Sequence, residues 1–236
     1  MMNSPSAIGN PKAEKIASYA LLGMTAVTGL VDAVSFLSLG SVFTANMTGN
    51  ILILAFATAR VPRLSVARSL TALISFVIGA ILGGRIMARA SADSRIRFAA
   101  QALLVEIVFL LAASVCGIGY SGYWMEHSFQ PFALIILTAL AMGTRNAAVR
   151  KLAIPDLTTT VLTLTVTGIA AESSLARGNN PRLTRRVGSV LAIFFGAALG
   201  AVVIRYSISA ALGLATGISV VCSAALFRSL RTSDKL

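Results

Sequence analysis

The sequence predicts an all-α membrane protein, a bundle of helices that crosses the bilayer several times. Apolar residues make up 56% of the 236-residue chain, and only 12% of the residues are charged; soluble domains carry about 25% charged residues. The mean hydropathy is +0.84. The apolar residues are concentrated in runs of about 20, the length of a membrane-crossing helix, and the basic residues lie in short clusters between those runs.

Six runs have the length of full spans. The first is too long for the core of a signal peptide, which is about 7–15 residues, so we expect it to be a retained helix. The six runs are residues 16–39, 69–87, 98–118, 132–142 extending toward 149, 187–204 and 208–227. We expect one transmembrane domain, residues 16–228, between a polar tail at 1–15 and a basic tail at 229–236.

Two shorter and more polar runs, residues 42–59 and 157–171, could each be a full span or a re-entrant element. Cytoplasmic loops carry an excess of Lys and Arg. With six crossings, most basic clusters and both termini fall on the cytoplasmic side, and loop 120–130, which has no Lys or Arg, falls outside. With eight crossings, that loop would lie on the cytoplasmic side and the basic cluster at 89–97 would lie outside. Six crossings therefore fit better, although run 42–59 is long enough to cross at about 1.5 Å per residue.

Several functional classes find no support in the sequence. The formal net charge is +12, but no basic stripe is interleaved with aromatic residues as in nucleic-acid-binding proteins. Cys116 and Cys222 both lie inside apolar runs and are expected to be packed thiols. His127 is the single histidine, so no zinc spacing is present. No catalytic motif is present. We therefore expect no metal, no cofactor and no enzyme activity.

The chain contains an internal repeat, with halves at about 16–120 and 131–228. A shift of 114 residues aligns Gly29 with Gly143, Asp32 with Asn146, Ala33 with Ala147 and Thr44 with Thr158; a shift of 117 aligns Arg68 with Arg185 and the motif Gly79/Gly83 with Gly196/Gly200. With three crossings in each half, the second half is inverted, as in many secondary transporters. The two Gly-x-x-x-Gly motifs indicate close helix packing, and the repeat suggests that these two spans pack on each other.

The stretch GLVDAVSFLSLGSVFTANMTGN, residues 29–50, carries several polar groups inside an apolar region. Asp32 shares one helix face with Thr28 and Ser35. An ionisable residue in a span marks a functional site by default, so Asp32 could line a cavity that binds a proton or a cation. The alternative is a structural ion pair, for which Arg145 is the obvious partner.

Asn46, Thr48 and Asn50 follow within twenty residues. If run 42–59 is a hairpin, its tip falls at Gly49-Asn50 and each helical leg is about 13 Å long. The tip would then lie near the bilayer midplane, where non-helical backbone needs protein or water around it. Alternatively, the run is a continuous span whose Asn and Thr side chains bond to neighbouring helices.

Two further polar features lie within apolar runs. In the second half, Asp156, Thr160, Thr163 and Thr167 fall on one helix face, although a membrane threonine often bonds only its own preceding carbonyl. Glu106 lies in the middle of a span and needs either a partner from another helix or a proton. It could serve a proton relay or a structural hydrogen bond.

The two signatures GLVDAVSFLSLGSVFTANMTGN and AMGTRNAAVRKLAIPDLTTTVLTLT resemble the YoaK-like family of bacterial inner-membrane proteins, a family of unknown function. The resemblance extends from about Ile16 to Phe227. It implies a multi-pass protein of the bacterial inner membrane, and it supplies neither a substrate nor catalytic residues.

The leading hypothesis is a transporter or permease for an unidentified small solute, with a central polar site between two inverted halves in the lipid bilayer. The candidate site residues are Asp32, Thr44, Asn46, Thr48, Asn50, Arg145, Asn146, Thr158 and Thr160, with Arg145 as counter-charge and with Asp32 and Glu106 as candidates for proton or ion coupling. The rivals are a non-transporting membrane protein, either a structural or interaction partner or a lipid-directed enzyme, and a passive channel. A homodimer is plausible because one chain has few helices to enclose a path.

Overall fold

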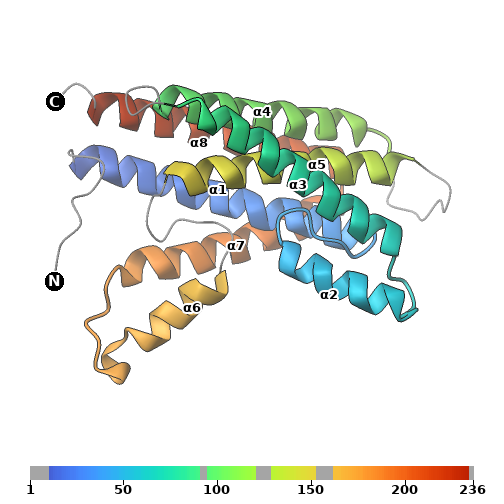
Figure 1. Cartoon of the computed structure of the whole chain (residues 1–236), viewed down its shortest axis with the longest axis horizontal. Helices are drawn as coiled ribbons and strands as arrows, with labels where there is room; N and C mark the ends of the chain where they lie inside the picture. Colours follow the sequence, from blue (N-terminus) through green and yellow to red (C-terminus); the bar gives the residue numbers. More distant parts are fainter. Residues whose placement is uncertain (1–10, 91–94, 121–128, 153–161, 234–236) are drawn as a thin grey trace.

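The computed structural model describes residues 11–90, 95–120, 129–152 and 162–233, and the regular secondary structure within them is helical (Figure 1). The elements are α1 (Pro11–Ser38), α2 (Met47–Thr58), α3 (Val66–Ala88), α4 (Arg95–Cys116), α5 (Gln130–Leu152), α6 (Leu162–Ala171), the short 3₁₀ turn η2 (Ser174–Ala176), α7 (Leu183–Val203) and α8 (Ile208–Ser233). Six of them, α1, α3, α4, α5, α7 and α8, are long and apolar enough to cross a membrane. This confirms the six predicted spans.

Over their described residues, the two remaining helices are too short to cross. The 12 residues of α2 and the 10 residues of α6 correspond to about 18 Å and 15 Å, whereas the hydrocarbon core is about 30 Å thick. The continuous span considered for run 42–59 is therefore wrong. Figure 1 shows α2 and α6 leaving the middle of the bundle toward opposite ends.

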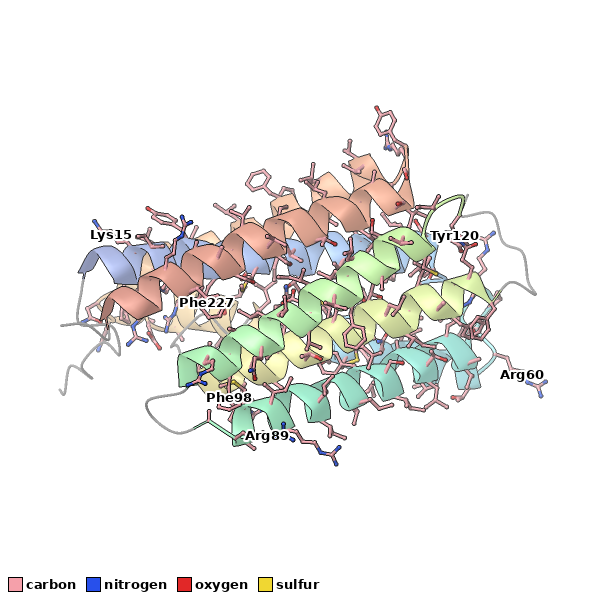
Figure 2. All side chains as sticks on the ribbon, turned by 90° about the horizontal axis from the view of Figure 1, so that it is seen from above. Lys15, Arg60, Arg89, Phe98, Tyr120 and Phe227 are labelled. Carbon is pink, nitrogen blue, oxygen red and sulfur yellow. The ribbon has the colours of Figure 1, made fainter. Side chains whose placement is uncertain are left out.

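The long helices lie side by side, and the order of their contacts repeats between the halves. Helix α1 packs on α7 and α8, helix α5 packs on α3 and α4, and α4 packs on α8. Seen from above, Lys15, Arg89, Phe98 and Phe227 lie toward one end of the bundle, and Arg60 and Tyr120 lie toward the other (Figure 2). The termini of the spans therefore alternate between the two ends as the six-crossing interpretation requires.

Glycines set the closest helix contacts. A Cβ on Gly29 of α1 would lie 2.2 Å from the carbonyl oxygen of Ile193 in α7, and a Cβ on Gly143 of α5 would lie 2.2 Å from that of Phe76 in α3. These residues are related by the shifts of 114 and 117 found in the sequence. The two interfaces are therefore built in the same way.

One packing prediction is wrong. The two Gly-x-x-x-Gly spans, α3 and α7, do not pack on each other; each packs on the first helix of the other half. Gly79 of α3 lies against the backbone of Leu140 in α5, and Gly196 of α7 lies against that of Ala26 in α1. The motifs do mark close helix packing, but their partners are α5 and α1.

Candidate functional site

Asp32 binds the backbone of the segment between α1 and α2. The amides of Thr44 and Ala45 donate hydrogen bonds to its Oδ1, at 3.1 and 2.8 Å. Asp32 lies six residues before the end of α1, or about 9 Å along the helix. The segment therefore runs back along α1 to that depth before α2 begins and returns toward the same end of the bundle (Figure 1). This is a re-entrant element made of a non-helical leg, residues 39–46, which we call the extended leg, and a helical leg, α2.

Asn50 holds the extended leg to α2. Its Oδ1 accepts from the amide of Phe43 at 2.8 Å, and its Nδ2 donates to the Phe43 carbonyl. The Asn50 side chain is completely buried. The prediction that Gly49-Asn50 forms a hairpin tip is wrong, because both residues lie in the first turn of α2. Gly49 is needed there, since a Cβ would lie 2.7 Å from the Phe43 ring.

The C-terminal end of α1 is held by Tyr120, which follows α4. Its hydroxyl donates to the Ser38 carbonyl at 3.1 Å. Burial raises the pKa of Tyr120 above its ordinary value, which favours the protonated form that this bond requires. The extended leg thus begins from a fixed position.

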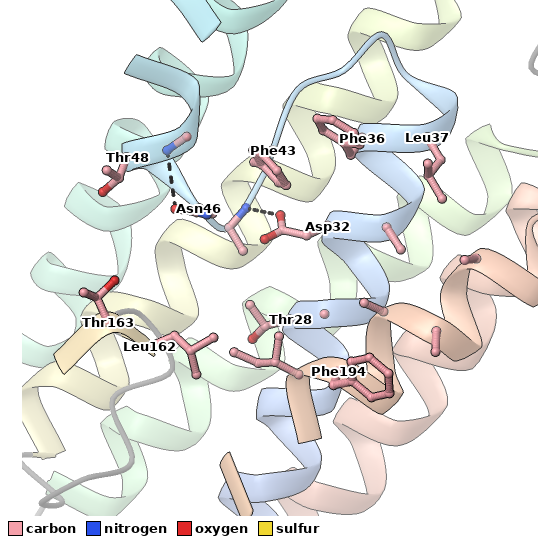
Figure 3. Close-up of a pocket in the computed structure, with 18 of the residues that line it drawn as sticks. Thr28, Asp32, Phe36, Leu37, Phe43, Asn46, Thr48, Leu162, Thr163 and Phe194 are labelled. Carbon is pink, nitrogen blue, oxygen red and sulfur yellow. Dashed lines mark hydrogen bonds between the residues drawn. The ribbon is translucent and has the colours of Figure 1, made fainter. Parts of the chain in front are cut away.

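A cavity of about 760 Å³ lies where the two short helices begin (Figure 3). It is lined by parts of α1 and α7, by the extended leg, and by the first turns of α2 and α6. The polar side chains on its wall are those of Thr28, Asp32, Asn46, Thr48 and Thr163, and the rest of the wall is aliphatic and aromatic. Residues far apart in the sequence, from both halves, therefore form one mostly apolar pocket.

The two carboxylate oxygens of Asp32 have different surroundings. Oδ1 accepts the two backbone bonds, whereas Oδ2 makes no hydrogen bond or ion pair with any described residue. Asp32 is only partly buried and lines the cavity. Among the described residues on the cavity wall, it is the only ionisable one.

Behind the cavity lies a buried ion pair. Arg145 of α5 contacts Glu106 of α4, with Nη1 and Oε1 3.1 Å apart, and both side chains are completely buried. Ser219 of α8 donates to the same Oε1 at 3.2 Å, and Arg145 Nη2 donates to Thr28 Oγ1 at 2.7 Å. The expected pairing of Arg145 with Asp32 is wrong, since its partner is Glu106. The partner expected for Glu106 from another helix is confirmed.

The predicted site residues separate into three groups. The cavity wall includes Asp32, Asn46 and Thr48. The wall does not include Thr44, Asn50 and Arg145, which are completely buried, or Asn146. The last two, Thr158 and Thr160, lie outside the described residues. The candidate set omitted Thr28, Thr163, Phe36, Phe43 and Phe194, all of which line the cavity. For Thr28 the signal was present, because it shares a helix face with Asp32.

Comparison with known proteins places these features in a family. The family described as "Protein of unknown function (DUF1275)" matches residues 20–225. The chain is 38% identical over 154 residues to the "UPF0700 transmembrane protein YoaK" of Bacillus subtilis (strain 168), a match that covers 65% of this chain and 65% of that relative. No solved structure matches this chain.

Proposed function

The chain belongs to the DUF1275 family of proteins of unknown function, and from that premise we propose that it is a small-solute transporter or permease of the bacterial inner membrane. The solute would bind in the cavity between α1, α7 and the starts of α2 and α6. Asp32, Asn46 and Thr48 would contact it, together with Thr28 and Thr163. The Glu106–Arg145 pair would lie behind the site and would be linked to it through Thr28.

The observation that carries this proposal is the position of the cavity. It lies where α2 and α6 begin, and neither of these helices is long enough to cross the membrane. Non-helical backbone at membrane depth is tolerated where it lines a cavity or is buried in protein. In many secondary transporters the substrate binds beside such discontinuous helices, near the midplane. The geometry therefore favours a solute site over simple packing.

We also propose that the two halves form an inverted repeat with both termini in the cytoplasm. The equivalent glycine contacts of α1 with α7 and of α5 with α3 support the repeat. The opposite directions of α2 and α6 in Figure 1 support the inversion. The distribution of Lys and Arg supports the orientation.

Single cysteines test whether water reaches the cavity. In a chain whose Cys116 and Cys222 are replaced, Thr48→Cys and Thr163→Cys in intact cells and inverted vesicles would be probed with a membrane-impermeant thiol reagent. We expect both positions to react, with a preference for one side. Thr138→Cys, at a completely buried threonine of α5, is the protected control, and exposed Arg60→Cys is the reactive control.

The outcomes separate the candidate functions. Protection of both cavity positions as complete as at Thr138 would refute the transport proposal. The second candidate, a non-transporting membrane protein, would then lead, because the backbone bonds of Asp32 and Asn50 show that polar residues here also hold the structure together. Equal and simultaneous labelling from both sides would instead favour a passive channel.

A further inference from the structure

We infer that the solute is an organic cation: an amine or quaternary ammonium group carried on an apolar body. This inference rests on the proposed function and specifies its substrate class. It follows from the charge, the aromatic side chains and the scarcity of oxygen ligands on the cavity wall.

The charge on the wall is negative. Asp32 is the only ionisable residue among the described residues that line the cavity, and its Oδ2 makes no bond to any of them. The nearest buried cation, Arg145, is paired with Glu106, so that pair adds no net charge. The starts of α2 and α6 each contribute a partial positive charge of about one half, which is spread over several amides, and Asn46 already caps the start of α2. The carboxylate of Asp32 is the one full charge on the described wall, so a cationic group beside its Oδ2 would be attracted to it.

Three phenyl rings line the cavity together with this carboxylate. Phe36 and Phe43 stack with ring centroids 4.9 Å apart and an interplanar angle of 21°, and Phe194 of α7 lies on the far side of Thr28 from them (Figure 3). Phe194 is 63% exposed within the chain, so its ring is available to a ligand. Aromatic faces attract ammonium groups. One carboxylate among phenyl rings is therefore suited to an alkylammonium group.

An inorganic cation fits this wall poorly. Ions such as Ca²⁺ take six to eight oxygen ligands, whereas the wall has one carboxylate with one oxygen already bound to backbone amides. The other polar side chains are three threonines and Asn46, whose Oδ1 accepts from the Gly49 amide. The volume of about 760 Å³ is within the range of small-molecule sites, about 300–1,000 Å³.

Three probes of similar shape test the inference on the purified full-length protein in neutral detergent. They are benzyltrimethylammonium, its neutral carbon analogue neopentylbenzene, and the anion phenylmethanesulfonate, and binding is measured by isothermal titration calorimetry. We expect saturable binding of benzyltrimethylammonium, at least about tenfold tighter than that of either other probe, because only the cation compensates Asp32.

Two variants locate the site. Asp32→Asn removes the charge but keeps an oxygen for the amides of Thr44 and Ala45, so the fold should persist while binding of the cation weakens at least about tenfold. Phe194→Leu should weaken it by about two- to fivefold through loss of the cation–π contact. Phe195→Leu is the matched control and should bind as the unchanged chain does, because Phe195 is equally exposed on α7 but does not line the cavity.

The inference is overturned if the neutral or anionic probe binds as tightly as the cation, if Asp32→Asn binds it unchanged, or if benzyltrimethylammonium shows no saturable binding at millimolar concentrations. Flux in proteoliposomes separates this result from the proposed function. Binding that depends on Asp32 but is accompanied by no flux would refute transport alone. Flux of an anionic or neutral solute that Thr48→Cys labelling blocks would refute the cation alone.

Discussion

Removing the charge of Glu106 or of Arg145 alone should destabilise the protein more than removing both charges together. The test uses Glu106→Gln, Arg145→Gln and the double variant. Glutamine at position 106 keeps an oxygen that can accept from Ser219, but it leaves a guanidinium that is completely buried. Glutamine at position 145 leaves a buried carboxylate.

The magnitude follows from burial. Breaking a buried ion pair by removing one partner costs about 3–5 kcal/mol, because the remaining charge is uncompensated. The double variant leaves no such charge and loses mainly the hydrogen bond from Arg145 to Thr28, at about 1 kcal/mol. Each single variant should therefore be less stable than the double variant by more than about 2 kcal/mol.

The assay is reversible unfolding in mixed micelles of a non-ionic detergent and dodecyl sulfate, followed by circular dichroism. The chain offers a control of the same chemistry in Arg186–Glu172, an ion pair 2.8 Å long whose glutamate is 47% exposed. Glu172→Gln should cost less than about 1 kcal/mol. The reasoning is refuted if the Glu106 and Arg145 effects add to within about 0.5 kcal/mol, or if Glu106→Gln costs no more than Glu172→Gln.

Three further predictions follow from the packing, each checked by the same unfolding assay. Gly143→Ala should destabilise the protein strongly, because its Cβ would meet a backbone oxygen of α3. The control is Gly84→Ala, whose Cβ would meet nothing within 4 Å, and it should be neutral or stabilise the protein by up to about 1 kcal/mol. Equal effects of the two substitutions would contradict the predicted contact. Asn50→Ala should cost about 2–3 kcal/mol by leaving both backbone groups of Phe43 unpaired, and hydrogen exchange of that segment should accelerate. Tyr120→Phe should cost about 1 kcal/mol through the lost bond to α1, and an unchanged stability would show that this bond contributes nothing.

The spans could be predicted because membrane insertion depends on the length and polarity of each segment, properties that a sequence carries locally. The re-entrant element shows the limit of that approach. Gly49-Asn50 has the pattern of a helix breaker, yet it lies inside the first turn of α2. The Phe43 ring occupies the space that a Cβ at position 49 would need. The side chain of Asn50 accepts a hydrogen bond from the backbone amide of Phe43. These contacts arise only once the segment has folded back.

The partner of Arg145 could not be predicted for a similar reason. The sequence contains two acids deep in spans, Asp32 and Glu106, and either could satisfy a buried arginine. The choice depends on which helices α5 packs against, and these are chiefly α3 and α4. Glu106 of α4 is thereby brought to Arg145, while Asp32 is left to the extended leg and the cavity.

Polar residues inside a membrane protein are commonly assigned either to function or to structure, but Asp32 shows that one side chain can serve both. Its Oδ1 holds the extended leg at membrane depth, and its Oδ2 faces the cavity that this leg helps to form. The same segment places Asn46 and Thr48 on the cavity wall and Asn50 behind it. The polar stretch therefore builds the site and lines it at once. For this reason Asp32→Asn, which keeps the anchoring oxygen, separates the two roles, whereas Asp32→Ala would abolish both and could not tell them apart.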